Sequence, residues 1–458
     1  MAAAGSMHAV DPSSDMEEAA RLALVGESAQ RKAAWRLLPV IAVGYGLAYM
    51  DRINISFASL QMNKELHFSA AVYGFGAGLF FIGYVLCEVP SNLLLLRFGA
   101  RRWLARIMFT WGLLAAAMMF VRTPLEFNAL RFLLGMAEAG FYPGVVYYLT
   151  LWFPARMRAR AVSRFYVSLP LSSVVMGSLA GWLLGLGGTL GLSGWQWLFL
   201  VEGLPTAVFS LVILKMLPDN PAKAAWLTAD EKAWLESQLK ADGAKAHLDH
   251  TAGVAQALLS PKVWMIGAYF FFALTTSYAY SFSAPAILVG VTGWSTTNVG
   301  FLVACFGLAG AAGMMLNSAH SDRSGERPLH CIVPCVVMAA GYLTASYAKV
   351  PWLVVAALAA SFTAFMAMLG PANAIPMQFL AGRAAAAGLA AMNTITMFAG
   401  FVGPYWMGVM KDYTGSYQVG LRGLVLPCLL AAGTMFALTR SLARRPAAPA
   451  ATLAQESA

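Results

Sequence analysis

Residues 109–121, FTWGLLAAAMMFV, and residues 352–369, WLVVAALAASFTAFMAML, contain no Asp, Glu, Lys or Arg. With their apolar neighbours, such runs reach the length of about twenty residues that a helix needs to cross the hydrocarbon core of a bilayer. They do not alternate apolar and polar residues, as the strands of a membrane β-barrel do. We therefore predict a bundle of transmembrane helices.

The composition of the whole chain agrees with this prediction. Of the 458 residues, 59% are hydrophobic and 11% are charged, and the mean hydropathy is +0.65. A water-soluble protein of this size needs more polar residues to cover its surface, whereas a bilayer solvates an apolar surface. Apolar windows between polar breaks predict twelve spans. We place them at residues 37–60, 72–96, 103–122, 125–150, 161–187, 197–217, 262–290, 297–318, 329–348, 351–380, 384–410 and 417–442.

The positive charges between the spans predict the orientation. If the N-terminus is cytoplasmic, the cytoplasmic segments carry most of the 31 lysines and arginines, among them Arg102, Arg158 and Arg444. Because cytoplasmic loops are enriched in Lys and Arg, we place both termini in the cytoplasm. The net charge of +10 follows from this asymmetry and does not indicate binding to nucleic acid.

The spans fall into two sets of six that share a loop. A shift of 226 residues aligns Arg97-Phe98-Gly99 and Arg101 with Arg323-Ser324-Gly325 and Arg327. Parallel repeats of this kind are typical of transporters that work by alternating access around a central site. We divide the chain into a cytoplasmic tail (1–36), a six-helix bundle (37–217), a cytoplasmic linker (218–261), a second six-helix bundle (262–442) and a cytoplasmic tail (443–458). In the linker, Thr228 and Glu231 predict a helix that begins with a capping box.

Several motifs resemble those of one family. The loops at residues 97–102 and 322–327 resemble the signature loop of the major facilitator superfamily, although Leu96 stands where an Asp is usual. Within that superfamily the chain is similar to the anion:cation symporters, which include transporters of tartrate, hexuronate, galactonate, phthalate and hydroxyphenylacetate. The resemblance implies an all-α membrane protein with two six-helix bundles, which imports a small organic anion with protons. The motifs that carry it are Tyr49-Met50-Asp51-Arg52-Ile53-Asn54, Glu88-Val89-Pro90-Ser91-Asn92, Arg131-Phe132-Leu133-Leu134-Gly135, Trp152-Phe153-Pro154-Ala155-Arg156 and Gly194-Trp195-Gln196-Trp197-Leu198-Phe199.

Four charged residues lie well inside the first set of spans: Asp51, Arg52, Arg131 and Glu138. A charge that faces lipid costs about 2.5 to 3.5 kcal/mol on insertion scales, so these side chains are expected to face one another or a cavity. Arg131 and Glu138 are seven residues apart and therefore lie on one helix face, roughly 10.5 Å apart along the axis. We expect all four side chains in a water-lined chamber between the two bundles.

The chemistry of these side chains suggests their roles. A guanidinium stays charged and can hold a carboxylate with two hydrogen bonds, whereas a carboxylate removed from water takes up a proton readily. Our hypothesis is that Arg52 and Arg131 bind the substrate while Asp51 and Glu138 carry protons, which the resemblance also implies. An ion-pair network that only joins helices is the alternative.

Polar aromatic and amide side chains near the middle of spans are further candidates for substrate binding. The resemblance implies that Tyr49 and Tyr84 line the site, and Tyr269 and Asn393 occupy plausible counterparts in the second half. Such groups orient a substrate by hydrogen bonds. Each of them could equally join two helices by a hydrogen bond.

Residues near the span ends are expected to have other roles. Glu88 and Glu202 are interpreted as capping or gate-pairing residues, and Tyr278 and Asn373 are weaker candidates for the site. The predicted gating loops contain Arg97, Gly99, Arg101, Asp322, Arg323, Gly325 and Arg327.

Other classes of function have less support. The six histidines and five cysteines show no metal-ligand or catalytic spacing, so we expect no enzyme, no metal site and no cofactor beyond the proton gradient. A proton-antiport exporter of the same fold stays open as an alternative, as does an importer of aromatic acids such as hydroxyphenylacetate or phthalate. We expect a monomer in the bacterial inner membrane, whose partners are the organic anion, protons and lipid.

Overall fold

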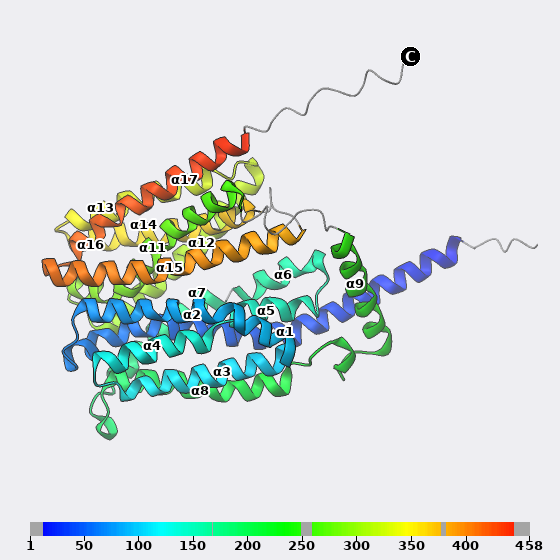
Figure 1. The fold of residues 1–458 in the computed structure, drawn as a ribbon, viewed down its shortest axis with the longest axis horizontal. Coiled ribbons are helices and arrows are strands. Elements are labelled where there is room, and N and C mark those ends of the chain that lie inside the picture. Colours follow the sequence, from blue (N-terminus) through cyan, green and yellow to red (C-terminus); the bar gives the residue numbers. More distant parts are fainter. Residues whose placement is uncertain (1–11, 167, 249–258, 377–381, 444–458) are drawn as a thin grey trace, which may run out of the picture.

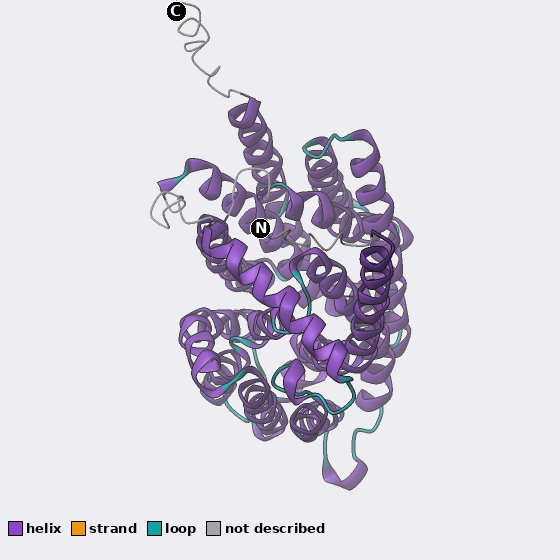
Figure 2. Ribbon diagram, turned by 90° about the vertical axis from the view of Figure 1, so that its right-hand side faces the viewer, coloured by secondary structure: helices purple, strands orange, loops and turns teal. Residues whose placement is uncertain are grey.

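The computed structural model describes residues 12–166, 168–248, 259–376 and 382–443. Within these ranges the chain forms helices joined by loops and contains no strand, as Figure 2 shows. The first half comprises α1 (Pro12–Glu65), α2 (Ala70–Phe98), α3 (Ala100–Ala117), α4 (Pro124–Glu138), α5 (Phe141–Thr150), α6 (Ala155–Tyr166), α7 (Ser168–Leu184) and α8 (Gly194–Met216), followed by α9 (Ala229–Leu248). The second half comprises α11 (Pro261–Thr292), α12 (Thr296–Ser324), α13 (Leu329–Tyr347), α14 (Pro351–Ala374), α15 (Gly382–Thr414), α16 (Tyr417–Gly423) and α17 (Val425–Ala443).

Two bundles lie side by side, with the first half of the chain below the second in Figure 1. Each bundle has six passes when α4 with α5, α6 with α7, and α16 with α17 are each counted as one pass. The prediction of twelve spans in two sets of six is therefore confirmed. Eight of the described helices are long and apolar enough to cross a membrane by themselves. The remaining passes include short helices on either side of a break, such as α4 and α5.

The structure differs from the predictions in one span and in the N-terminal tail. The predicted helix at residues 125–150 is broken, because Gly140 takes a φ of +86° between α4 and α5. Residues other than glycine rarely adopt this conformation, and a Cβ at that position would lie 2.4 Å from Ser91 Oγ. Moreover, α1 starts at Pro12, so much of the predicted tail at residues 1–36 is helical and projects beyond the bundles toward α9 (Figure 1).

The linker helix α9 packs against the projecting part of α1. Gly26 lies against Trp234, whose indole ring would be 2.4 Å from a Cβ at residue 26. The Arg36 guanidinium lies 5.4 Å from the ring centroid of Trp226, which precedes α9. These contacts hold the linker at one end of the first bundle, which we call the linker end. We call the opposite end of both bundles the far end.

Glu231 makes the polar contact between α9 and α1. It is buried, it accepts a hydrogen bond from Ser28 Oγ at 2.8 Å, and it pairs with Lys32 Nζ at 2.8 Å. Its carboxylate also accepts from the Thr228 N–H at 2.9 Å, while its own N–H donates to Thr228 Oγ1 at 3.3 Å. The predicted capping box is thus confirmed. Burial alone would raise the pKa of Glu231, but the hydrogen bonds from Lys32, Thr228 and Ser28 lower it to about 2.

Glu231→Gln is expected to loosen α9 from α1. A hydrogen bond to a charged group contributes about 1.5 to 3 kcal/mol, so amide hydrogens of residues 228–235 should exchange roughly 10 to 100 times faster. The folded pKa lies below the ordinary value of 4.5, so the wild-type contact is at full strength above pH 4.5 and is lost as the pH falls toward 2. Hydrogen–deuterium exchange measures both effects, with Glu236→Gln on the same helix as the control. Equal protection in the two variants would contradict this assignment.

Helices of the two bundles approach closely at the far end. Across α2 and α15, a Cβ on Gly74 would lie 2.4 Å from the Pro404 carbonyl oxygen. Across α7 and α12, a Cβ on Gly300 would lie 2.1 Å from the carbonyl oxygen of Gly177. Glycine is therefore required at these positions for the bundles to meet.

A polar contact across the bundles accompanies these glycines. The Asp412 carboxylate near the end of α15 accepts hydrogen bonds from the N–H groups of Ala70 and Ala71, at 2.9 and 2.8 Å. These N–H groups begin α2 and have no partner within that helix, so a carboxylate of the other bundle caps it. The far end is closed in this structure.

Candidate functional site

An ion pair joins α1 and α4 inside the first bundle. Arg52 Nε donates to Glu138 Oε1 at 2.8 Å, and a second guanidinium nitrogen contacts the same oxygen. The side chain of Glu138 is fully buried, whereas that of Arg52 is 20% exposed. Among the described residues, Glu138 Oε2 has no hydrogen-bond partner. Arg52 is therefore the member of the pair that a solute can reach.

Aromatic rings of α2 support both arginines. The Arg52 guanidinium lies 5.7 Å from the ring centroid of Phe80 and 5.4 Å from that of Tyr84. The Arg131 guanidinium lies 4.9 Å from the same Phe80 ring. Arg131 is 1% exposed, and its Nε and one Nη lack a partner in the described part of the chain. A buried cation needs anionic neighbours, and the charges of Asp51 and Glu138 act on Arg131.

Two buried acids of the same bundle, Asp51 and Glu202, share one amide partner. The Asn54 side-chain amide donates to Asp51 Oδ1 at 3.3 Å and also to Glu202 Oε2 on α8. Asp51 and Glu202 are buried, at 3% and 5% exposure. One amide thus bridges two carboxyl groups. The charges of Glu138 and Arg131 also act on Asp51. The Arg52–Glu138 ion pair and the two acids that share Asn54 therefore belong to one electrostatic network.

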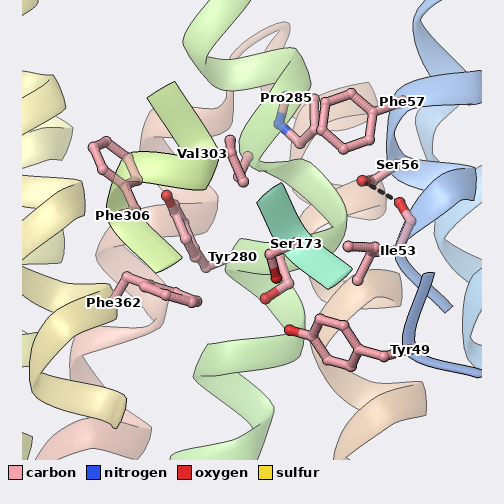
Figure 3. Close-up of a pocket in the computed structure, with 12 residues that line it drawn as sticks. Tyr49, Ile53, Ser56, Phe57, Ser173, Tyr280, Pro285, Val303, Phe306 and Phe362 are labelled. Carbon is pink, nitrogen blue, oxygen red and sulfur yellow. Dashed lines mark hydrogen bonds between the residues drawn. The ribbon is translucent and has the colours of Figure 1, made fainter. Parts of the chain in front are cut away.

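A small cavity of about 40 Å³ lies between the bundles. Figure 3 shows Tyr49 of α1 directing its hydroxyl toward Ser173 of α7, and Tyr280 of α11 on the facing side. The Tyr280 hydroxyl is buried and has no hydrogen-bond partner among the described residues. Arg52 and Glu138 do not line the cavity, but Ile53, which follows Arg52 in α1, does. The lining residues are Tyr49, Ile53, Ser56, Phe57, Ser173, Tyr280, Ser281, Ala284, Pro285, Val303, Phe306 and Phe362.

Two further polar contacts join the bundles. The Asn393 side-chain amide on α15 donates to Glu88 Oε1 on α2 at 2.8 Å. The Tyr73 hydroxyl on α2 donates to the Phe282 carbonyl oxygen on α11 at 2.9 Å. Breaking and remaking such contacts is what a relative movement of the bundles requires.

The structure corrects four of the predicted positions. Tyr269 is fully buried in the core of the second bundle, where its hydroxyl donates to Met368 Sδ at 3.1 Å, so it does not line the cavity. Asp51, Arg131 and Glu138 are buried inside the first bundle and do not line the cavity between the bundles. Helical periodicity places a residue on a face, but it does not distinguish a bundle interior from the interface between bundles.

The other predicted site residues lie near the bundle interface. Tyr49 lines the cavity, Tyr84 is buried beneath Arg52, and Asn393 contacts the opposite bundle. Glu202 and Asn54 were missed as members of the network. Glu202 lies several residues inside the predicted span 197–217, and that depth in an apolar run is the signal that could have identified it.

Both predicted gating loops place a glycine of positive φ directly after a helix, although ψ is 142° at Gly99 and 0° at Gly325. Gly99 follows α2 with a φ of +86°, and Gly325 follows α12 with a φ of +70°. In the second loop, Arg327 lies 3.9 Å from Asp322. The repeat inferred from sequence is thus a repeat of helix ends that require glycine. A gating role for Arg97, Arg101 and Arg323 stays a prediction.

Comparisons with known proteins agree with this fold. The family model described as Major Facilitator Superfamily matches residues 41–404. A protein of Agrobacterium vitis named as a tartrate transporter is 42% identical over 90% of this chain and 91% of its own length. A protein of Acinetobacter baumannii named quinolone resistance transporter is 38% identical over 85% of this chain and 90% of its own length.

A solved structure shows the same fold. It is a crystal structure of a bacterial homologue of the human lysosomal transporter Spinster, described as inward-facing and unoccupied. The TM-score is 0.74 and the sequence identity 18%, over 92% of this chain and 99% of that chain.

Proposed function

The chain belongs to the Major Facilitator Superfamily, and from this premise we propose that it imports a small organic anion together with protons by alternating access. It is a multi-pass membrane transporter and not an enzyme. The observation that carries the proposal is the ion pair in which the Arg52 side chain is partly exposed while that of Glu138 is fully buried.

A substrate carboxylate and the Glu138 carboxylate would compete for Arg52. A substrate carboxylate that reaches Arg52 offers it the same charge-assisted hydrogen bonds that Glu138 now makes. Once Arg52 turns to the substrate, Glu138 becomes a buried carboxylate without that cation. Burying an unpaired charge is costly, so Glu138 takes up a proton. Substrate binding and proton uptake thereby become one linked event.

The closed far end indicates to which side of the membrane the site is open in this conformation. With both termini in the cytoplasm, as we propose, the linker end is cytoplasmic and the far end is closed toward the outside. The structure then corresponds to an inward-facing state. Opening the far end would separate Gly300 from Gly177 and Asp412 from the start of α2.

An aromatic acid is the second candidate substrate, and the lining of the cavity favours it. Phe57, Tyr280, Phe306 and Phe362 surround a narrow space, which suits a planar ring with a carboxylate. A hydroxylated dicarboxylate such as tartrate would instead use Tyr49, Ser173 and Tyr280 as hydrogen-bonding groups. Export by proton antiport is the alternative direction.

Purified protein in liposomes tests this function. Tartrate-like acids, sugar acids and aromatic acids are offered from outside, with the lumen either more alkaline than the bath or at equal pH. We expect one class to accumulate against its gradient only when the lumen is alkaline, and to carry protons inward. Accumulation that ignores the pH gradient, or needs the opposite gradient, would exclude proton-coupled import.

Tyr280→Phe is expected to weaken substrate binding about 10-fold, or 1.4 kcal/mol, without changing the pH dependence of transport. The reason is that the Tyr280 hydroxyl is buried at the cavity and has no partner among the described residues, so it is free to bind a substrate oxygen. The measurement is KM for uptake in liposomes. Tyr413→Phe, on a side chain that is 86% exposed, is the control. An unchanged KM in Tyr280→Phe would remove this residue from the site.

A further inference from the structure

The buried polar network of the first bundle contains one more acid than it has cations. Its acids are Asp51, Glu138 and Glu202, and its cations are Arg52 and Arg131. Glu138 is paired with Arg52. Asp51 and Arg131 attract each other electrostatically. Glu202 is therefore the acid for which no cation is left. A third carboxylate without a counter-charge is strongly disfavoured in a bundle interior.

Among the residues that the structure describes, no cation acts on Glu202. From α1, the side chains that act on it are Asn54, which donates a hydrogen bond, and Asp51, which carries a like charge. No ionisable side chain of α3 or α7 acts on it among the described residues. The Arg131 charge of α4 acts on the neighbouring Asp51.

Two unpaired oxygen atoms lie in this contact. Glu202 Oε1 and Asn54 Oδ1 are both buried and have no partner in the described part of the chain. The Asn54 amide nitrogen already donates to the other Glu202 oxygen, so its own oxygen can only accept. A protonated Glu202 would supply an O–H donor for that oxygen. A single proton would thus neutralise the extra acid and also satisfy an orphaned acceptor.

We propose that Glu202 is a further proton-binding site of this transporter, protonated in the conformation seen here and exchanging its proton with Asp51 during transport. The exchange rests on the proposed function. When Asp51 takes up a proton, the repulsion that keeps Glu202 neutral disappears and Arg131 loses its counter-charge. Glu202 then releases its proton and becomes the carboxylate that balances the network, so one proton arrives and another leaves.

Infrared spectroscopy of the purified protein tests the protonation without any substrate. A protonated carboxylic acid has a carbonyl stretch that a carboxylate lacks. We expect wild-type protein at pH 8 to show this band, Glu202→Gln to lose it, and Glu138→Gln to keep it, because Glu138 is ionised against Arg52. Absence of the band from the wild type, or its persistence in Glu202→Gln, would overturn the proposal.

Transport assays test the exchange. Glutamine copies the protonated acid, so Glu202→Gln should exchange substrate at equal pH within about twofold of the wild type, while accumulation driven by a pH gradient falls at least about 10-fold. Glu202→Asp should keep the infrared band and part of the accumulation. If Glu202→Gln accumulates substrate normally, Glu202 is only a structural acid and the proposal is wrong. If instead the wild type itself fails to couple protons, the proposed function fails while the infrared test of Glu202 still stands.

Discussion

Glu138→Gln is expected to abolish pH-driven accumulation of the substrate, a loss of about 100-fold or more, while the protein still binds the anion. Glutamine cannot take up a proton, and it leaves the charge of Arg52 without a carboxylate. The anion then meets no competitor for Arg52, so its KM for exchange should fall and should no longer depend on pH. In the wild type, Glu138 is buried against a partly exposed Arg52. We therefore expect the wild type to have a higher KM for exchange, and this KM to depend on pH.

The measurement compares two assays of the same liposomes. Exchange of labelled for unlabelled substrate at equal pH reports binding and the movement of the loaded carrier, whereas uptake under a pH gradient reports proton coupling. Arg52→Lys should lose both, because a lysine cannot reproduce the guanidinium contacts with a carboxylate. Glu236→Gln on α9 is the control for an acid-to-amide change. Undiminished accumulation in Glu138→Gln would refute the coupling proposed for this residue.

The lower KM expected for Glu138→Gln distinguishes the role of Glu138 from that of Glu202. Glu202 does not contact Arg52, so Glu202→Gln should leave the substrate affinity unchanged. Both variants are expected to lose accumulation, but only Glu138→Gln should lose the pH dependence of exchange. The two acids thus have different readouts even though one network connects them.

The sequence predicts much of this arrangement because charge is rare in apolar spans. Asp51, Arg52, Arg131 and Glu138 stand out there, and the structure does bring their side chains near one another. Which of them reaches the interface between the bundles depends on how the helices are rotated. A single residue step is 100°, and predicted span ends are uncertain by several residues.

Tyr269 shows the same difficulty in the second bundle. Its place in the middle of a span is typical of both a binding residue and a core residue, and packing against Met368 decides for the core. Glu202 was interpreted as a residue near a span end because it follows a motif at the start of α8. Its contact with Asn54 joins residues 148 positions apart, which no local pattern contains.

Gly300→Val is expected to abolish transport by a different route, since it would prevent closure of the far end. A Cβ on Gly300 would lie 2.1 Å from the Gly177 carbonyl oxygen, and a backbone atom cannot move aside as a side chain can. Overpacking of this kind costs about 1 to 3 kcal/mol, which is enough to change the ratio of two conformations by roughly 5- to 150-fold. The outward-open form, in which α7 and α12 separate, should then dominate.

Spin labels on opposite bundles measure this shift directly. In a cysteine-free background, Arg122→Cys and Lys349→Cys place one label in the exposed loop after α3 and one in the exposed loop after α13. The distance between the labels should lengthen in Gly300→Val, and substrate should still bind from outside although exchange stops. Gly433→Val on α17 is the matched control, because nothing lies within 4 Å of a Cβ at that position. An unchanged distance distribution in Gly300→Val, with transport intact, would mean that the contact between Gly177 and Gly300 does not close the far end.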